Sequence, residues 1–218
     1  MATETTLDIA ETFYSIQGES TYAGLPCVFI RLAGCNLRCS YCDAAFTYDE
    51  PGRRMTIDQL LSYTGHYPQA IIEITGGEPL LQENVYRLMD SLVIQGRTVL
   101  LETNGSLDIS RVPPVVVRIM DLKCPDSGMR DQMDMRNLDR LAPDDEVKFV
   151  ISSERDYQWA KHMVTEHSLT QKTAVLFSPV TKKIAPAELA GMIMADQLPV
   201  RLQLQLHTVL WPGQERGI

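Results

Sequence analysis

The sequence predicts an α/β fold, a partial (β/α) barrel of about six parallel strands covered by helices. Short apolar runs alternate with segments of helical periodicity, a pattern typical of a parallel sheet joined by crossover helices. An open doubly wound sheet would give the same alternation. A complete eight-unit barrel takes about 250 residues, whereas this chain has 218 residues and only six or seven strand-like runs. We therefore expect one incomplete barrel, forming a single domain over residues 1–218.

The individual elements follow from local patterns. Strands are expected at residues 28–32, 70–75, 98–102, 115–121, 147–151, 174–178 and 201–206. Helix signals lie between them: a capping box at Thr56 and Gln59, a stop at Gly96 for the helix after Pro79, an N-cap at Ser153 and an opening proline at Pro186. The connection from residue 102 to residue 115 contains Asn104-Gly105 and Pro113-Pro114, so we expect turns there.

Composition excludes several classes of protein. The chain has 20 basic and 28 acidic residues, a net charge of -8 that argues against nucleic acid as a direct partner. Its longest apolar runs are far shorter than the roughly 18 residues of a membrane span. The first residues lack the basic region and apolar stretch of a secretory signal, so we expect a cytoplasmic protein that acts on small molecules.

The five cysteines are unevenly placed, because Cys35, Cys39 and Cys42 fall on one short segment. An odd number of cysteines in a reducing compartment favours metal or redox chemistry over disulfides. Three thiolates at this spacing can hold a 4Fe-4S cluster with one open iron. A zinc site with Asp43, His66 or Cys27 as fourth ligand is the alternative.

Cys35-x3-Cys39-x2-Cys42, with Tyr41 before the last cysteine, resembles the cluster motif of radical S-adenosylmethionine (SAM) enzymes. The resemblance implies a 4Fe-4S cluster whose open iron binds SAM, which is cleaved to a 5′-deoxyadenosyl radical. The segment 72–79, Ile-Glu-Ile-Thr-Gly-Gly-Glu-Pro, is similar to the Gly-Gly-Glu-Pro motif of the same enzymes. Taken alone, that segment also fits an ordinary strand-to-helix turn.

Other segments resemble the 7-carboxy-7-deazaguanine synthase family over nearly the whole chain. They are 13–20 (Phe-Tyr-Ser-Ile-Gln-Gly-Glu-Ser), 31–35 (Arg-Leu-Ala-Gly-Cys), Cys42-Asp43, 102–105 (Glu-Thr-Asn-Gly), 121–125 (Asp-Leu-Lys-Cys-Pro) and 205–213 (Gln-Leu-His-Thr-Val-Leu-Trp-Pro-Gly). The resemblance implies ring contraction of 6-carboxy-5,6,7,8-tetrahydropterin with loss of ammonia, in queuosine biosynthesis.

Carried over position by position, the resemblance assigns residues to three groups. The cluster would be bound by Cys35, Cys39 and Cys42. SAM would be lined by Ser40, Tyr41, Asp43, Gly77, Glu78, Thr103, Asn104, Asp121, Leu122, Lys123, Ser152, Phe177, Ser178, Pro179 and Val180, with Gly77 and Glu78 at its methionine moiety and the last five residues at its ribose and adenine. The pterin would contact Ile16, Gln17, Gly18, Glu19, Arg31, Thr75 and His207.

The residue types suit these roles. Arg31 can hold a carboxylate through a bidentate fork, and Gln17 can pair with the donor and acceptor edge of a pterin. Simpler interpretations are a surface ion pair for Arg31, a turn cap for Gln17 and a structural role for His207.

One position departs from the family. Its members often carry Thr or Ser directly after Cys-Asp, where the hydroxyl helps to ligate Mg²⁺, whereas this chain has Ala44. A methyl group cannot ligate a hard cation. The ion would then be held by the substrate, water and Asp43 or Thr47, or would not be required.

Predictions can also be made for the two remaining cysteines, the carboxyl-terminal tail and the partners of the protein. Cys27 and Cys124 are interpreted as small buried packing residues. The resemblance implies that the tail at 211–218 closes over the substrate or contributes to a homodimer, and that an electron donor such as flavodoxin or ferredoxin reduces the cluster. Two alternatives are a radical SAM activating enzyme with a protein substrate, and a non-enzymatic zinc or iron–sulfur module.

Overall fold

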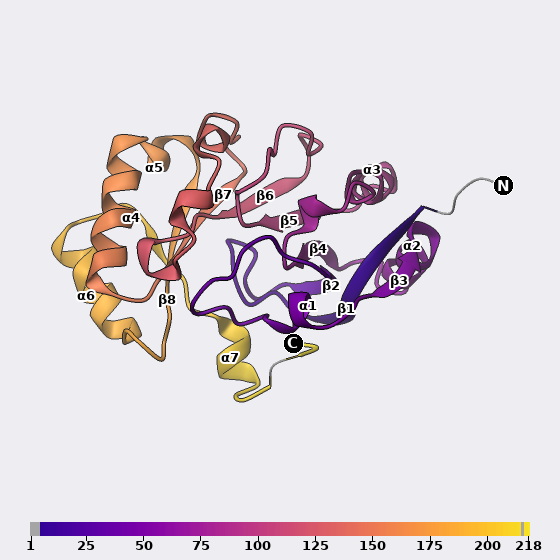
Figure 1. Ribbon diagram of the computed structural model, residues 1–218, viewed down its shortest axis with the longest axis horizontal. Helices are drawn as coiled ribbons and strands as arrows, with labels where there is room; N and C mark the ends of the chain where they lie inside the picture. Colours follow the sequence, from indigo (N-terminus) through magenta and orange to yellow (C-terminus); the bar gives the residue numbers. More distant parts are fainter. Residues whose placement is uncertain (1–4, 215) are drawn as a thin grey trace.

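The computed structural model describes residues 5–214 and 216–218, and its described part is built on one nine-stranded sheet (Figure 1). The strand order is β3-β1-β2-β4-β5-β6-β7-β8-β9. From β2 onward each neighbouring pair is parallel, whereas β1 pairs with both β2 and β3 in the antiparallel sense. The sheet is open, because β3 and β9 are its two edges and do not pair with each other, which confirms a partial barrel rather than a closed one.

The elements have the following bounds. The strands are β1 (Thr6–Ile16), β2 (Pro26–Leu32), β3 (Arg53–Thr56), β4 (Ile71–Gly76), β5 (Val99–Thr103), β6 (Val117–Asp121), β7 (Glu146–Ile151), β8 (Ala174–Pro179) and β9 (Arg201–Leu202). The helices are α1 (Phe46–Asp49), α2 (Ile57–Gly65), α3 (Val85–Ile94), α4 (Glu154–Glu166), α5 (Leu169–Lys172), α6 (Pro186–Ala195) and α7 (Leu206–Leu210), with 3₁₀ turns η1 (Pro79–Leu81), η2 (Pro125–Ser127), η3 (Arg130–Gln132) and η4 (Met135–Asp139).

The predicted helix signals are confirmed. The Thr56 hydroxyl accepts from the Gln59 amide, and the Gln59 side chain accepts from the Thr56 amide, which closes the capping box of α2. The Ser153 hydroxyl caps α4, and Pro186 begins α6. The connection between β5 and β6 contains turns and no helix among its residues, as expected.

Three details of the predicted sheet are wrong or missing. The run at 201–206 is a strand only at Arg201–Leu202, because the Leu206 amide donates to the Gly18 carbonyl and the chain turns into α7. The two antiparallel strands β1 and β3 are absent from the prediction. The sequence of β3 is short and charged, which is common for an edge strand.

Alternation along the strands separates the sheet into two faces. One face is covered by helices: α2 and α3 pack on β2, β4 and β5 around Ile72 and Ile74, and α4 and α6 pack on β7 and β8 around Phe149 and Phe177. We call the opposite face the inner face. Charged side chains on this face lie toward the carboxyl ends of the parallel strands. The rest of the face is apolar and is formed by Phe13, Cys27, Phe29, Leu100, Val117 and Ile119.

Within the described part of the chain, no helix is long and apolar enough to cross a membrane. Cys27 and Cys124 are completely buried, in agreement with a packing role for both.

Candidate active site

The three predicted cluster ligands lie on the loop between β2 and α1. Cys35 and Cys39 are half-buried and Cys42 is exposed. The buried side chain of Leu37 fixes the loop to the core beneath it. The Arg38 guanidinium donates to the carbonyls of Cys35 and Leu37, at 2.9 and 2.7 Å. Part of the support of the loop therefore comes from its own residues, and Cys35 and Cys39 pack against the core.

The loop contains the soft donors that a cluster needs. Burial raises the pKa of the Cys39 and Cys42 thiols, and Lys123 opposes the shift at both, because its charge favours the thiolate. Among the described residues, no three His, Cys, Asp or Glu side chains are close enough to hold one metal ion. A cubane binds its cysteines through separate irons and so needs a wider set of ligands than a single zinc ion. The residues fit the cluster, and of the fourth ligands considered for zinc, Cys27 is fully buried in β2.

The Gly-Gly turn after β4 packs directly against this loop. The Gly77 and Glu78 amides donate to the carbonyls of Leu32 and Gly34, at 3.2 and 2.9 Å. A Cβ at Gly77 would lie 2.2 Å from the Gly34 carbonyl oxygen and 2.7 Å from Cys35 Cβ. Glycine is required here because the backbone touches the cluster loop.

The Glu78 carboxylate anchors this turn from inside the protein. It is fully buried and accepts from the amides of Leu80 and Asn104 and from the Thr103 hydroxyl, at 2.7–3.0 Å. Asn104 in turn lies 3.9 Å from the Cys35 thiol through its side-chain nitrogen. Three residues assigned to SAM thus brace the cluster loop, and the turn itself offers a ligand its backbone, since the Glu78 side chain points inward.

The end of β6 provides an acceptor for a ligand. Asp121 Oδ2 accepts from Lys123 Nζ at 2.8 Å, whereas Oδ1 is buried and has no hydrogen-bond partner among the described residues. An orphaned buried carboxylate oxygen is costly, so a bound donor would stabilise it. The pair lies beside Cys39, whose thiol it influences. Asp121 fits the predicted SAM site, but the neighbouring Leu122 side chain is buried in the core under α4.

Residues assigned to ribose and adenine divide between the two faces. The Phe177 side chain is fully buried on the helix-covered face, with its ring centroid 5.5 Å from that of Phe149, so only the Phe177 backbone is left to contact SAM. Ser178 lies on the inner face beside Val150, whose carbonyl accepts from the Tyr41 hydroxyl. The Ser152 hydroxyl donates to Asp156 of α4 at 2.8 Å.

Two further SAM assignments concern the loop ends. The Ser40 hydroxyl donates to the Asp126 carbonyl at 2.6 Å and ties the cluster loop to η2. Pro179 ends β8, and the Val180 amide donates to the Ile151 carbonyl, which places this turn beside the end of β7.

The pterin assignments at the start of the chain lie in a loop that crosses the inner face after Ile16. Gln17 is 2% exposed; its amide nitrogen donates to Glu73, and its oxygen accepts from the Glu19 amide at 3.0 Å. The Gln17 side chain is therefore occupied within the protein by Glu73 and by the Glu19 backbone.

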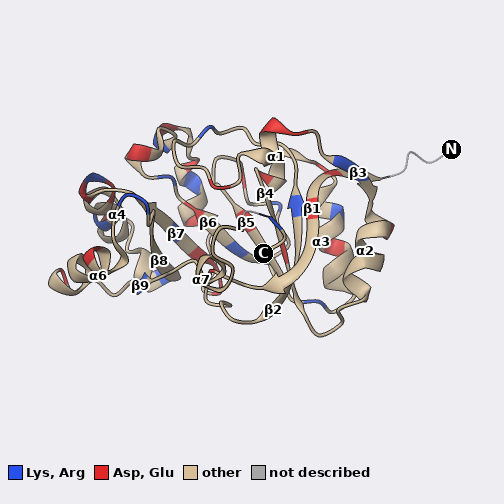
Figure 2. Cartoon of the chain, turned by 90° about the horizontal axis from the view of Figure 1, so that it is seen from below, with Lys and Arg blue, Asp and Glu red and all other residues tan. Residues whose placement is uncertain are grey.

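A buried charge cluster, formed by Glu19, Glu73, Glu102 and Lys148, lies beneath this loop. Lys148 Nζ donates to Glu19 at 2.7 Å and to Glu102, and Thr75 donates to Glu102 at 2.9 Å. Figure 2 shows charged segments on these central strands. Burial, with the charges of Glu102 and Glu19, raises the pKa of Glu73 to about 8.

Glu102 and Lys148 stabilise each other's charge. Burial opposes the charge of Glu102, but Lys148, Thr75 and Arg31 together outweigh burial and lower the Glu102 pKa to about 2. Burial likewise disfavours the Lys148 ammonium, but Glu102 and Glu19 raise its pKa well above the usual value. Glu73, Glu102 and Lys148 are not among the site residues predicted from the sequence. The available signal was a charged residue inside an apolar strand, as in Ile71-Ile-Glu-Ile74.

The carboxyl-terminal segment joins the same region from the other end of the sequence. A Cβ at Gly18 would lie 2.4 Å from His207 Nδ1, so glycine is needed for the close approach of the tail. The Gln205 side chain donates to Glu19 at 2.9 Å and to Asp43 at 3.3 Å. The structure thus brings together Gly18, Glu19 and His207, as the sequence assignments require.

Arg31 lies at the end of β2, next to Thr75 on β4. Its Nε donates to Glu11 at 2.9 Å, and its guanidinium carbon lies 5.8 Å from the Phe13 ring centroid. The side chain is 20% exposed. Arg31 is therefore partly paired, on the same face as the charge cluster.

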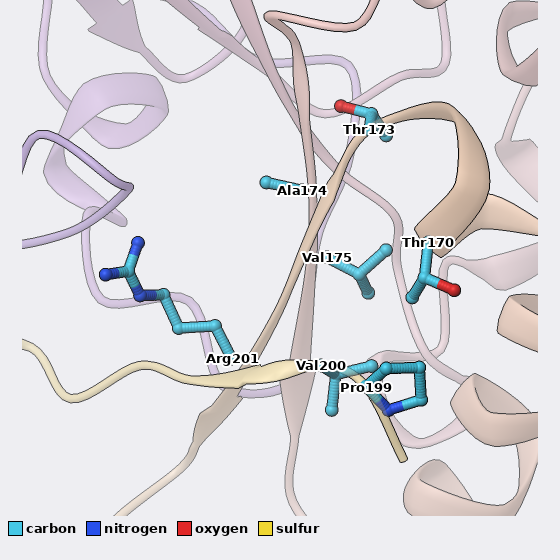
Figure 3. A pocket seen from close by; sticks show the side chains of 7 residues that line it. All are labelled: Thr170, Thr173, Ala174, Val175, Pro199, Val200 and Arg201. Carbon is cyan, nitrogen blue, oxygen red and sulfur yellow. The ribbon is translucent and has the colours of Figure 1, made fainter.

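A separate groove of about 390 Å³ lies away from these residues (Figure 3). It is lined by Thr170, Thr173, Ala174, Val175, Pro199, Val200 and Arg201. Thr173 and Ala174 lie at the amino end of β8. None of the sequence-predicted site residues lines it, so the candidate site is the carboxyl-end region of the inner face.

Comparison with known proteins gives the same assignment. Residues 29–124 match the Radical SAM superfamily. The chain is 44% identical to the 7-carboxy-7-deazaguanine synthase of Chlorobaculum tepidum over 100% of both proteins, and 42% identical to that of Koribacter versatilis over 97% of this chain and 100% of the relative. The crystal structure of QueE from Escherichia coli superposes with a TM-score of 0.76 and 22% identity, covering 95% of this chain and 100% of that one, which supports the fold. A chain with this identity along its whole length, and with three cluster cysteines packed on a Gly-Gly-Glu-Pro turn, belongs to the 7-carboxy-7-deazaguanine synthase family of radical SAM enzymes.

Proposed function

We propose that this chain converts 6-carboxy-5,6,7,8-tetrahydropterin to 7-carboxy-7-deazaguanine with release of ammonia, as a step of queuosine and 7-deazapurine biosynthesis. The observation that carries the proposal is the 44% identity to a synthase of that name over the full length of both chains. The polar inner face supports it, because its groups match the chemistry of a carboxylated pterin.

The substrate would be held by positively and negatively charged side chains. The free edge of the Arg31 guanidinium suits the substrate carboxylate. The carboxylates of Glu19 and Glu102, both paired with Lys148, suit the ring N–H and amino donors of a pterin. His207 and the Gly18 backbone would close the site from the tail side.

The cluster and SAM, when bound, supply the radical that begins ring contraction. Cys35, Cys39 and Cys42 would hold the cluster, and the unpartnered Asp121 oxygen would accept a hydrogen bond from SAM. The loop after β1 and the tail would exclude water from the substrate. As usual when a cofactor supplies the difficult step, the protein mainly positions and shields.

We infer that any Mg²⁺ ion is bound mainly by substrate and water. Ala44 has no ligating oxygen in its side chain. The Thr47 hydroxyl is buried and donates to the Ala44 carbonyl at 2.7 Å, so it is already occupied. Asp43 is exposed and remains the protein carboxylate nearest in sequence to this position.

We also propose that the enzyme works in the cytoplasm as a homodimer that receives electrons from a flavodoxin or ferredoxin. A reducing compartment suits the cluster thiols, all of which are free. The exposed Cys42 marks where a donor would approach, and the exposed apolar Val209 and Leu210 of α7 offer a surface for a second subunit.

Anaerobic reconstitution with iron and sulfide, followed by incubation with SAM, reductant and the carboxytetrahydropterin, tests the proposal. We expect a brown iron–sulfur chromophore and the deazapurine by mass spectrometry. Cys42→Ser should abolish the product, whereas Cys124→Ala should retain it, because Cys124 is buried away from the loop surface. SAM cleavage without deazapurine would instead indicate an activating enzyme, and a colourless protein with stoichiometric zinc would indicate a non-enzymatic module.

A further inference from the structure

A β-bulge in β1 determines which way Glu11 points. Ile9 pairs with Leu32 and Glu11 pairs with Arg31, so Ala10 is an extra residue on β1. Ile9 is buried in the core under α2 and α3. Strict alternation would point Glu11 into the same core, but the extra residue turns it to the inner face beside Arg31. Bulges commonly re-aim a side chain in this way next to active sites.

Glu11 fixes one edge of the Arg31 guanidinium. Glu11 Oε1 accepts from Arg31 Nε at 2.9 Å, and the two side chains are 16% and 20% exposed. Among the described residues, Glu11 is the only ion-pair partner of Arg31. The terminal nitrogens of Arg31 therefore remain for a ligand. Thr75, which lies beside Arg31 on β4, donates to Glu102, and the charge of Arg31 helps to lower the pKa of Glu102.

The second oxygen of Glu11 holds the carboxyl-terminal tail. Glu11 Oε2 accepts from the Gly217 amide at 3.2 Å, across 206 residues of sequence. The adjacent Arg216 pairs with Glu50 and lies 4.1 Å from the Phe46 ring centroid. Figure 1 shows the chain end beside α1 and β1. One carboxylate thus contacts both the guanidinium and the tail.

We propose that Glu11 is a positioning residue that couples substrate binding at Arg31 to docking of the tail. The inference rests on the proposed function, in which Arg31 receives the pterin carboxylate. Glu11 keeps the guanidinium oriented so that its terminal nitrogens form a bidentate fork. The hydrogen bond from the Gly217 amide partly offsets the negative charge of Glu11. It thereby reduces the repulsion between Glu11 and a substrate carboxylate bound to the same guanidinium. A docked tail therefore favours the substrate, and by thermodynamic reciprocity the substrate favours the docked tail.

Glu11→Gln is the direct test. The amide keeps one acceptor oxygen and presents an NH₂ group to the other partner, so either Arg31 or Gly217 loses its contact. We expect the KM for the carboxytetrahydropterin to rise about tenfold, which corresponds to about 1.4 kcal/mol, with kcat changed by less than about twofold. Hydrogen exchange of the tail peptide should be slowed by substrate in the wild type and not in the variant.

Two further variants separate coupling from a folding defect. Arg216→Ala releases the tail from Glu50 without touching Arg31 and should raise KM about threefold. Glu83→Gln removes the same charge from an exposed pair with Arg111 and should leave KM and tail exchange unchanged.

The outcomes distinguish this proposal from the proposed function. A wild-type KM in Glu11→Gln, or a raised KM with substrate protection of the tail intact, would overturn the coupling. If the wild type does not convert the pterin, the proposed function fails instead. Tail exchange without substrate still tests Glu11 in that case, since it should be faster in Glu11→Gln.

Discussion

Replacement of Lys148 by methionine should destabilise the protein strongly. The Lys148 side chain is 5% exposed, and its ammonium lies 2.7 Å from Glu19 and 3.7 Å from Asp121, in addition to its pair with Glu102. Methionine retains most of the aliphatic length, so the main change is the loss of the positive charge. Glu19 and Glu102 would then face each other without a compensating cation, while Asp121 would keep its pair with Lys123.

The expected loss follows from the burial of the partners. Removing one member of a buried ion pair costs about 3–5 kcal/mol. The Glu19 and Glu102 side chains remain 19% and 26% exposed, which allows partial hydration. We therefore expect the free energy of unfolding to fall by about 3 kcal/mol, the lower end of that range.

Urea unfolding at neutral pH measures this change. Lys161→Met is the matched control, because Lys161 pairs with Asp196 at side-chain exposures of 35% and 29%, and it should cost less than about 1 kcal/mol. The double variant with Glu102→Gln should recover part of the loss, since it removes one unpaired carboxylate. Equal losses in the two lysine variants, or no recovery in the double variant, would refute the electrostatic reasoning.

Three other outcomes are expected. The first concerns Glu73, which in the folded protein keeps its proton up to a pKa of about 8, whereas an unfolded glutamate loses its proton near 4.5. The stability of the wild type should therefore fall relative to that of Glu73→Gln by up to about 1.4 kcal/mol per pH unit between these two values. A difference in stability that does not change in denaturant titrations from pH 5 to 8 would contradict this. Gly77→Ala should prevent stable iron incorporation, measured as iron per chain, because the new Cβ would lie 2.2 Å from the Gly34 carbonyl oxygen. The control is Gly191→Ala in α6, which should bind iron normally because a Cβ there meets no atom within 4 Å. Ala44→Thr should increase the dependence of activity on Mg²⁺ in chelator titrations, whereas Ala45→Thr should not, and identical titration curves would rule out a ligand role for position 44.

The sheet was predictable where strands are buried on both sides. Parallel strands such as β5 and β8 consist mainly of apolar residues. β1 escaped prediction because the bulge at Ala10 breaks its alternation, and a bulge is fixed by pairing with β2 rather than by local sequence. The run at 201–206 was misassigned because its polar backbone groups find the loop at Gly18 instead of a neighbouring strand.

The candidate site was predictable as a list of positions, but less so as a set of side-chain roles. Motifs located the cluster loop and the Gly-Gly turn, yet Glu78 and Gln17 use their side chains inside the protein. Such pairings join residues that are far apart in sequence, so no local pattern encodes them. The importance of Lys148 emerges only when the register places it beside Asp121.

The return of the chain end to β1 and α1 has a practical consequence for handling the protein. An affinity tag fused after Ile218 would extend from beside the Gly217 contact with Glu11 and would compete with that contact. A tag at the other end would precede β1, which starts beside β3 at the far side of the molecule from α7 (Figure 1). Purification tags therefore belong at the amino terminus. Kinetic constants from preparations tagged at the carboxyl terminus would describe an enzyme in which the contact between the tail and Glu11 is weakened.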